Sequence, residues 1–305
     1  MASAPMSIRA LAPWFGGKRT LAPTIVEELG SHVAYWEPFC GSMAVLFAKP
    51  RSHMETVNDL HGDLINLAHV LASDWHRELH ERLNRTLMAD ALFVESKERL
   101  AASWIPAASL EGIEAAHCER AYWYMVNSWM GRNGTSGTTH TNITIATRYT
   151  SNGGSGGFRW RSAVDSVPAW HERLQNVHIK CVDGVELVDR IEDSVDSAIY
   201  VDPPYLEKGT KYLHDFEAAD HRKLAEALRS KRETRIVVSY YDHPELENLY
   251  PGWTKRPVAF AKSLINSGRR GERGKVSKVV APEVLLINGP SFALERSLFE
   301  QGELK

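Results

Sequence analysis

The sequence predicts an α/β protein in which a mostly parallel β-sheet carries a long, mainly helical insertion. Short apolar runs alternate with helix-like segments in both the first and the last part of the chain, as expected of parallel strands joined by helices. Between them, helical periodicity dominates from Asp63 to about Met130. The 305 residues and the 43% hydrophobic content suit one large globular domain or two modest ones.

Six segments are predicted to be strands, because each is a short apolar run next to polar or turn-forming residues. They are residues 33–39, 54–59, 177–183, 197–202, 235–241 and 284–288. We expect a short helix to start between Gly41 and Lys49, and another to run from about Ala218 to Lys231. The segment 68–170 is then an insertion into a fold that is built from residues 1–67 and 171–305.

The formal net charge of -2 hides an uneven distribution of charge. Residues 120–164 contain no acidic side chain, and residues 254–282 contain eight Lys or Arg and one acid, Glu272. Arginines mixed with aromatics, as in the first window, are typical of nucleic-acid surfaces, where guanidinium groups bind phosphates and rings stack on unpaired bases. The alternative is a solvated loop whose aromatics belong to the core. The arginines of this window are Arg120, Arg132, Arg148, Arg159 and Arg161, and its aromatics are Tyr122, Trp123, Tyr124, Trp129, Tyr149, Phe158 and Trp160.

Several classes of protein are excluded by composition. No run of 18 apolar residues is present, so we expect no membrane span. The first 30 residues lack the apolar core of a signal peptide, which favours a cytoplasmic protein. The three cysteines form no close pair and the 13 histidines show no ligand spacing, so we expect no metal site.

The sharpest motif is Asp202-Pro203-Pro204-Tyr205, directly after a strand predicted to be buried. Ligands of α/β sheets bind at the carboxyl ends of the strands. The two prolines fix the backbone and donate no hydrogen bonds, so a carbonyl is left to point outward. Carboxylate and carbonyl together can accept both hydrogens of an exocyclic amino group while the ring stacks on the base. The alternative is a plain proline turn.

Three weaker features accompany this motif. The turn from Glu37 to Ser42 contains Gly41, which permits close approach of a cofactor to the backbone at a helix N-terminus. Asp59 follows Gly41 by 18 residues at the end of the second strand, where an acid binds ribose hydroxyls or caps a helix. Near the N-terminus, Lys18 follows a Gly-Gly pair and could meet a carboxylate, although that segment could also be an ordinary turn.

The ordered set of motifs resembles the Dam-type (D12 class, alpha group) S-adenosylmethionine-dependent DNA adenine N6-methyltransferases. The set is PWFGGK, EPFCGS, VNDLHGDLIN, a variable insertion, DPPY and a closing E-x-L-L strand, here Glu283-Val284-Leu285-Leu286. The resemblance implies a Rossmann-like methyltransferase sheet with an inserted, mainly helical target-recognition region (68–170) and a C-terminal β-hairpin. Residues 1–67 and 171–305 would form the catalytic, cofactor-binding domain.

The resemblance also implies roles for individual residues. Asp59 would hold the ribose of S-adenosylmethionine, and Asp183 would contact its adenine edge. The target adenine would be handled by Asp202, Pro203, Pro204 and Tyr205. One position departs from the family pattern, because Met43 stands where a second glycine is usual. The residues implied to bind the cofactor are Trp14, Lys18, Glu37, Phe39, Gly41, Asp59, Asp183 and Asp202.

The expected reaction is direct methyl transfer to N6 of an adenine flipped out of double-stranded DNA. The expected protein is bacterial or phage-encoded, a monomer or weak dimer, without a metal. Two alternatives are an amino-methyltransferase acting on cytosine N4 or RNA, and a catalytically silent DNA-binding fold. Asp before the proline pair favours adenine, since cytosine enzymes more often carry Ser there. The expected DNA contacts are Arg132, Asn133, Arg148, Arg159, Arg161, Arg269, Arg270, Arg273 and Lys275.

Overall fold

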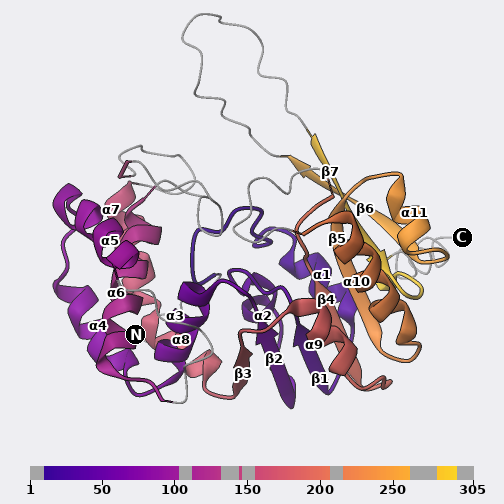
Figure 1. The fold of residues 1–305 in the computed structure, drawn as a ribbon, viewed down its shortest axis with the longest axis horizontal. Helices are drawn as coiled ribbons and strands as arrows, with labels where there is room; N and C mark the ends of the chain where they lie inside the picture. Colours follow the sequence, from indigo (N-terminus) through magenta and orange to yellow (C-terminus); the bar gives the residue numbers. More distant parts are fainter. Residues whose placement is uncertain are drawn as a thin grey trace, which may run out of the picture.

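The computed structural model describes residues 10–102, 112–131, 144–145, 155–206, 216–261 and 280–293. Its strands are β1 (Ala34–Glu37), β2 (Met54–Asn58), β3 (Val177–Lys180), β4 (Ser197–Val201), β5 (Arg235–Tyr241), β6 (Thr254–Ala261) and β7 (Val280–Ile287). Within the described residues they form a seven-stranded sheet in the order β3-β2-β1-β4-β5-β7-β6 (Figure 1). The predicted α/β class and all six predicted strands are therefore confirmed.

The strand order of the sheet reverses between β1 and β4. Strands β1 to β5 pair in parallel, with β2 and β3 added on one side of β1 and β4 and β5 on the other. The carboxyl ends of β1 and β4 therefore lie at a topological switch point, where open α/β sheets bind their ligands. Strand β7 is antiparallel to both β5 and β6, so the expected C-terminal hairpin is present.

Strand β6 is the one strand of the sheet that the sequence pattern did not predict. It lies at the edge, and it carries Lys255, Arg256 and Pro257 in its first half. Charged residues and proline are tolerated on an edge strand because one side of its backbone needs no partner strand. The same residues hide the alternating apolar pattern that identifies a central strand.

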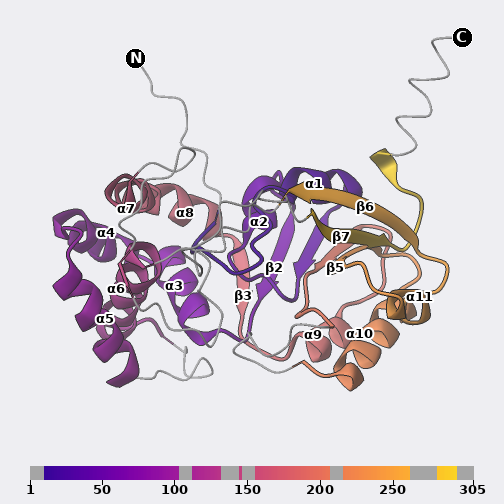
Figure 2. The same ribbon diagram turned by 90° about the horizontal axis from the view of Figure 1, so that it is seen from above.

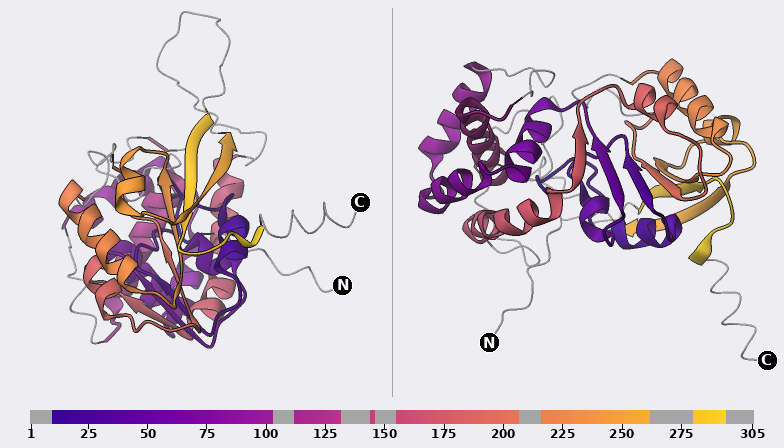
Figure 3. Two further views of the ribbon diagram at one scale, coloured as in Figure 1. Left: turned by 90° about the vertical axis from the view of Figure 1, so that its right-hand side faces the viewer. Right: turned by 90° about the horizontal axis from the view of Figure 1, so that it is seen from below.

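Helices cover both faces of the sheet, as parallel strands require. In the view from above, α1 and α2 lie on one face and α9 and α10 on the other, and the view from below agrees (Figures 2 and 3). The helices are α1 (Ala22–Leu29), α2 (Ala44–Ala48), α3 (Gly62–Ala72), α4 (His76–Arg85), α5 (Asp90–Ala102), α6 (Ala115–Met130), α7 (Gly156–Asp165), α8 (Val167–Leu174), α9 (Gly184–Arg190), α10 (Ala218–Ser230) and α11 (Glu245–Leu249).

Alternating side chains of the central strands feed two hydrophobic cores. In β4, Ala198 and Tyr200 pack with the residues of α1, α2, α3 and α6, while Ile199 and Val201 pack with those of α9, α10 and α11. All four are at most 1% exposed. Strand β4 is thus apolar on both faces, which is why its sequence reads as a continuous apolar run and not as an alternation.

The insertion forms a group of helices beside the sheet (Figure 1). Helix α6 packs against α4, α5 and α7, while α3 and α8 lie between this group and the edge strand β3. The predicted bounds at 68 and 170 fall inside α3 and α8, so the domain division stays a prediction. The Trp129 indole of α6 donates a hydrogen bond of 2.9 Å to the Leu11 carbonyl, which ties the insertion to the N-terminal segment. No described helix is long and apolar enough to cross a membrane.

Candidate active site

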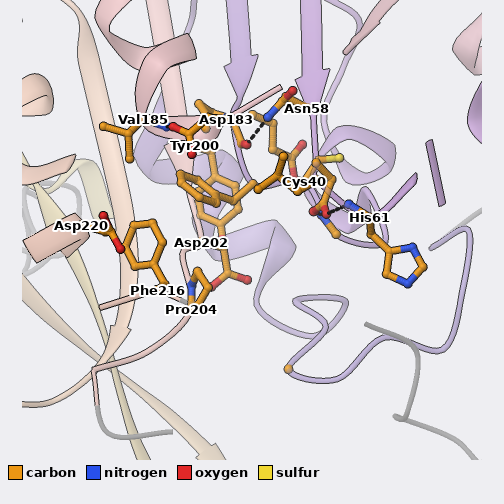
Figure 4. A pocket seen from close by; sticks show the side chains of 18 of the residues that line it. Cys40, Asn58, His61, Asp183, Val185, Tyr200, Asp202, Pro204, Phe216 and Asp220 are labelled. Atoms are coloured by element: carbon orange, nitrogen blue, oxygen red, sulfur yellow. Dashed lines mark hydrogen bonds between the residues drawn. The ribbon is translucent and has the colours of Figure 1, made fainter. Parts of the chain in front are cut away.

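A cavity of about 710 Å³ opens at the switch point of the sheet. The residues after β1, β2, β3 and β4 contribute to its wall, together with the segment 14–18 and helix α10. Figure 4 shows Asp202 and Pro204 in the middle, with Phe216 and Asp220 to one side and Cys40 and His61 to the other. The structure brings most of the predicted catalytic and cofactor-binding residues to this cavity: Trp14, Lys18, Glu37, Phe39, Gly41, Asp59, Asp183, Asp202 and Pro204.

Glycine 41 lets the turn after β1 pass close to an aromatic side chain. Its φ of +44° lies in the left-handed region, and a Cβ atom there would stand 2.7 Å from the Trp14 Nε1 atom. Gly184 plays a similar part, because its Cβ would meet the Phe39 ring at 2.6 Å. Both glycines therefore permit aromatic rings to close over the backbone at the cavity wall.

Met43 occupies the position where the motif of the resembling family has a second glycine. Its φ is 60° and its ψ is 30°, a left-handed conformation that is strained for any residue with a Cβ. This explains why glycine suits the position. The Met43 side chain is fully buried in the core that packs with α1 and α2, and it is not among the residues that line the cavity. The turn thus keeps its shape at the cost of some backbone strain.

Asp59 and Asn58 hold the loops that follow β1 and β3. Asp59 accepts hydrogen bonds from the backbone amides of Gly41 at 2.8 Å and His61 at 2.9 Å, one on each carboxylate oxygen. Asn58 donates to the Pro38 carbonyl and exchanges two hydrogen bonds with the Val182 backbone. The Asp59 carboxylate lines the cavity. Each of its oxygens keeps lone-pair capacity for a further donor.

Asp183 begins helix α9. Its Oδ1 atom accepts hydrogen bonds of 2.9 Å from the amides of Val185 and Glu186, the pattern of an N-cap. The residue also lines the cavity. The expected contact with a cofactor's adenine remains a prediction, for which the second carboxylate oxygen is the candidate atom.

Asp202 lies at the centre of a buried cluster of polar groups. Its Oδ2 atom accepts a hydrogen bond of 2.7 Å from the Lys18 ammonium, and its Oδ1 atom accepts one of 2.8 Å from the Ser239 hydroxyl. Lys18 also lies 3.3 Å from the Glu283 carboxylate. Burial raises the pKa of Asp202, and Lys18 offsets part of that rise. Burial lowers the pKa of Lys18, but attraction to both carboxylates outweighs burial and raises it, so Lys18 stays charged.

Tyr205 and Pro203 lie deeper than the sequence suggested. The Tyr205 side chain is 5% exposed and packs edge-on against Tyr241, with ring centroids 4.4 Å apart. Its hydroxyl lies 2.7 Å from Glu283 Oε1 and 3.2 Å from Asp202 Oδ1. Among the described residues that line the cavity, the motif contributes Asp202 and Pro204. The expected stacking of the Tyr205 ring on a base is therefore not seen in this conformation.

One known family matches this arrangement of motifs. The family described as D12 class N6 adenine-specific DNA methyltransferase matches residues 14–262, which include every predicted cofactor residue and the Asp202–Tyr205 motif.

The chain belongs to this family. It is an adenine-specific DNA methyltransferase, as the motif order predicted. No curated protein sequence matches the chain.

Two buried residues of the methyltransferase site were missed by sequence reasoning. Ser239 lies in β5 and Glu283 in β7, and both contact the Asp202 cluster. Glu283 could have been predicted as a site residue, because it is an acidic residue directly before a run of apolar residues and is the first residue of the E-x-L-L motif. Ser239 could not have been predicted as a site residue, since a single serine within an apolar run is common in buried strands.

Among the described residues of the two basic windows of the methyltransferase, several basic side chains form ion pairs within the protein. Arg120 is 5% exposed and pairs with Asp63. Lys255 pairs with Asp242, and Arg256 with Glu28. Arg161 is 54% exposed and pairs with Asp165 at 2.7 Å.

The remaining predicted DNA contacts can be placed only in part. Arg159 is half-buried beside the Trp129 carbonyl. The other predicted contacts lie outside the described residues: Arg132, Asn133, Arg148, Arg269, Arg270, Arg273 and Lys275.

For four aromatic residues of the first window the structure supports the alternative, in which the aromatics belong to the core. Tyr122, Trp123, Tyr124 and Trp160 are at most 5% exposed and belong to the core. Helix α6 is surrounded by α3, α4, α5 and α7, so three consecutive aromatic residues are all covered. Phe158, at 76% exposed, is an exception. In the described part of the chain no cluster of His, Cys, Asp or Glu could hold a metal ion.

Glu37 is expected to make the stability of the methyltransferase depend on pH. It is 1% exposed, accepts a hydrogen bond of 2.8 Å from the Tyr35 hydroxyl, and burial raises its pKa from 4.5 to about 8. The folded state therefore holds the proton more tightly than the unfolded state does. The stabilisation is complete below pH 4.5 and is lost as the pH rises towards 8, by roughly 4 kcal/mol.

The variant Glu37→Gln tests this expectation, because the amide cannot ionise but still accepts the Tyr35 hydrogen bond. The free energy of unfolding is measured by urea denaturation at several pH values between 4.5 and 8. We expect Glu37→Gln to lose much less stability over this range than the wild type. The exposed Glu192→Gln is the control and should follow the wild type. A Glu37→Gln curve parallel to the wild type would contradict the assignment.

Proposed function

We propose that this methyltransferase moves a methyl group from S-adenosylmethionine to N6 of an adenine flipped out of double-stranded DNA. The observation that carries the proposal is the position of Asp202. Asp202 directly follows β4 at the switch point and lines the same cavity as the Gly41 turn. Lys18 and Ser239 orient its carboxylate by donating hydrogen bonds to it.

The residues of the cavity fit S-adenosylmethionine. Gly41 and Gly184 let the Trp14 and Phe39 rings pack directly on the backbone, where a Cβ would collide with them, so that both rings can form the wall of a ligand pocket. The acidic residues that line the cavity suit a cationic sulfonium and a ribose, among them Asp59, Asp183 and Asp202. When bound, S-adenosylmethionine supplies an electrophilic methyl group. We assign Asp59 to its ribose, Asp183 to its adenine edge, and Trp14, Lys18, Phe39 and Gly41 to the rest of the pocket.

Asp202 and Pro203 act on the target amino group in this proposal. The N6 lone pair of adenine is delocalised into the ring and is a poor nucleophile. Hydrogen bonds from N6–H to the Asp202 carboxylate and the Pro203 carbonyl favour a more tetrahedral nitrogen, whose lone pair then points at the methyl group. The N–C bond would form as the sulfonium C–S bond breaks, so that a neutral thioether leaves and the methylated nitrogen gives one proton to water. Positioning and preorganised electrostatics supply the rate enhancement, and no covalent enzyme intermediate is needed.

Base flipping is required in this proposal because Asp202 lies inside the cavity and not on the surface of the protein. Asp202 lies inside a cavity, and an adenine within a duplex cannot reach it, so the base must leave the stack at a cost of a few kcal/mol. Stacking of Tyr205 on the flipped base requires its ring to turn out of the contact with Tyr241. The ring would tilt away from Tyr241 while the Tyr205 hydroxyl keeps its hydrogen bond to Glu283.

The proposal is tested by transfer of a tritiated methyl group from S-adenosylmethionine to unmethylated plasmid DNA. We expect label in DNA and, after hydrolysis, in N6-methyladenine. Label in N4-methylcytosine, or transfer only to RNA, would contradict the assigned base or substrate. DNA binding without any transfer by the wild type would leave a catalytically silent DNA-binding protein.

The proposed DNA surface is expected to make binding depend on salt. We assign it to the insertion and to the basic segment between β6 and β7. Arg161 is its exposed described member, and its surface ion pair with Asp165 is weak enough to yield to a phosphate. Arg161→Ala should reduce the slope of log affinity against log salt by about 1. Fluorescence anisotropy with a labelled duplex measures the slope. The control is Arg190→Ala on α9, also exposed and paired, and an equal slope in both variants would refute the assignment.

A further inference from the structure

Glu283 is a buried carboxylate without a role in the function described so far. It lies in β7, directly before the apolar residues Val284 to Ile287, and is 6% exposed. A buried carboxylate costs several kcal/mol unless it is paired. Its Oε1 atom accepts from the Tyr205 hydroxyl at 2.7 Å and lies 3.3 Å from the Lys18 ammonium.

Glu283 and Asp202 share the same two donors. The Lys18 ammonium lies 2.7 Å from Asp202 and 3.3 Å from Glu283. The Tyr205 hydroxyl has one hydrogen, and the shorter of its two contacts is to Glu283, at 2.7 Å against 3.2 Å to Asp202. Glu283 is thus the main acceptor of the Tyr205 hydroxyl hydrogen, and it competes with Asp202 for the electrostatic attraction of the Lys18 ammonium. Ser239 donates to Asp202 without contacting Glu283.

We propose that Glu283 is a positioning residue, which holds Lys18 and Tyr205 so that the Asp202 carboxylate keeps an oxygen open to the amino group of the target adenine. This inference rests on the proposed function of Asp202. A carboxylate oxygen has two lone pairs, and Oδ2 has one occupied by Lys18. Without the charge of Glu283, Lys18 and Tyr205 would both turn fully to Asp202, and the carboxylate would be a weaker acceptor.

The charge of Glu283 also affects the titration of Asp202. Repulsion from Glu283 raises the pKa of Asp202, whereas the hydrogen bond from Ser239 lowers it. The other titratable groups coupled to Asp202 are Lys18, Glu37, Tyr200, Tyr205 and Tyr240. Removal of the Glu283 charge ends this repulsion and lets Lys18 and Tyr205 turn to Asp202, and both changes lower the pKa of Asp202, whereas removal of the Ser239 hydroxyl raises it. The two substitutions are therefore expected to move the titration of Asp202 in opposite directions.

The experiment measures single-turnover methyl transfer to duplex DNA at saturating S-adenosylmethionine, as a function of pH, for the wild type, Glu283→Gln and Ser239→Ala. We expect Glu283→Gln to lower the plateau rate about tenfold, the value of one net hydrogen bond, and to move the acid limb to lower pH. Ser239→Ala should move the acid limb to higher pH. A thermal unfolding scan of each variant shows that it is folded.

The possible outcomes distinguish failure of the proposed function from failure of the positioning role of Glu283. No transfer by the wild type refutes the proposed function itself. Transfer by the wild type, with an unchanged rate and acid limb in Glu283→Gln, refutes the positioning role, because a residue that serves packing alone would not move the titration. If Glu283→Gln does not fold, Glu283→Asp replaces it. Its shorter carboxylate withdraws from both donors, so the plateau rate should fall, and an unchanged rate would refute the role.

Discussion

Asp202→Ala is expected to reduce the single-turnover rate of methyl transfer by roughly 10³-fold, because the variant has no carboxylate to accept a hydrogen of the target amino group. The Lys18 ammonium keeps Glu283 as a partner at 3.3 Å, so no buried charge is left unpaired and the fold should survive. Affinities for S-adenosylmethionine and duplex DNA, measured by calorimetry and fluorescence anisotropy, should change far less than the rate.

Asp196→Ala is the matched control for this variant. Asp196 directly precedes β4, whereas Asp202 directly follows it, so the two carboxylates stand at opposite ends of one strand. Asp196 is exposed and its backbone carbonyl, which accepts from Val33 and Ala34, is unaffected by the substitution. We expect wild-type transfer by Asp196→Ala. Full activity in Asp202→Ala would remove Asp202 from the reaction.

Gly41→Ala is expected to weaken S-adenosylmethionine binding by roughly 10²-fold. A Cβ at this position meets Trp14 Nε1 at 2.7 Å, and the φ of +44° adds strain of about 1–2 kcal/mol for any residue other than glycine. Trp14 must therefore leave the cavity wall or the turn must change shape. Calorimetric titration of the purified protein with S-adenosylmethionine measures the affinity, and circular dichroism monitors the fold.

The control for this substitution is Gly112→Ala. A Cβ at Gly112 meets no atom within 4 Å, and this glycine is not in the left-handed region. The same change of one hydrogen to a methyl group should leave cofactor affinity as in the wild type. Equal affinities in the two alanine variants would show that the Gly41 turn does not bind the cofactor.

The sequence was sufficient where a site residue belongs to a local pattern. The buried run of β4 followed by Asp202-Pro203-Pro204-Tyr205 predicted both the position of the carboxylate and the end of the strand. The strands themselves were predictable because β4 and β5 are apolar on both faces. Lys18 was expected to meet a carboxylate, and it meets Asp202 across 184 residues of sequence.

The sequence was insufficient where the environment comes from distant segments. Ser239 reaches Asp202 because β5 pairs in parallel with β4, and Glu283 reaches the partners of Asp202 because β7 pairs with β5 in an antiparallel register that places Glu283 beside Tyr241. The burial of Tyr122, Trp123 and Tyr124 depends on helices packed around α6, and charge windows contain no such information. Residues that pair internally, such as Arg120 with Asp63, look from sequence alone like candidates for phosphate binding.

Leu11 joins two parts of the molecule that are expected to bind different ligands. Its carbonyl accepts from Trp129 of the insertion, and its amide donates to the Ser42 carbonyl beside Gly41 at 3.0 Å. These two hydrogen bonds connect α6 to the turn proposed to hold the cofactor. Thermodynamic linkage then requires reciprocity: any factor by which DNA tightens cofactor binding equals the factor by which the cofactor tightens DNA binding.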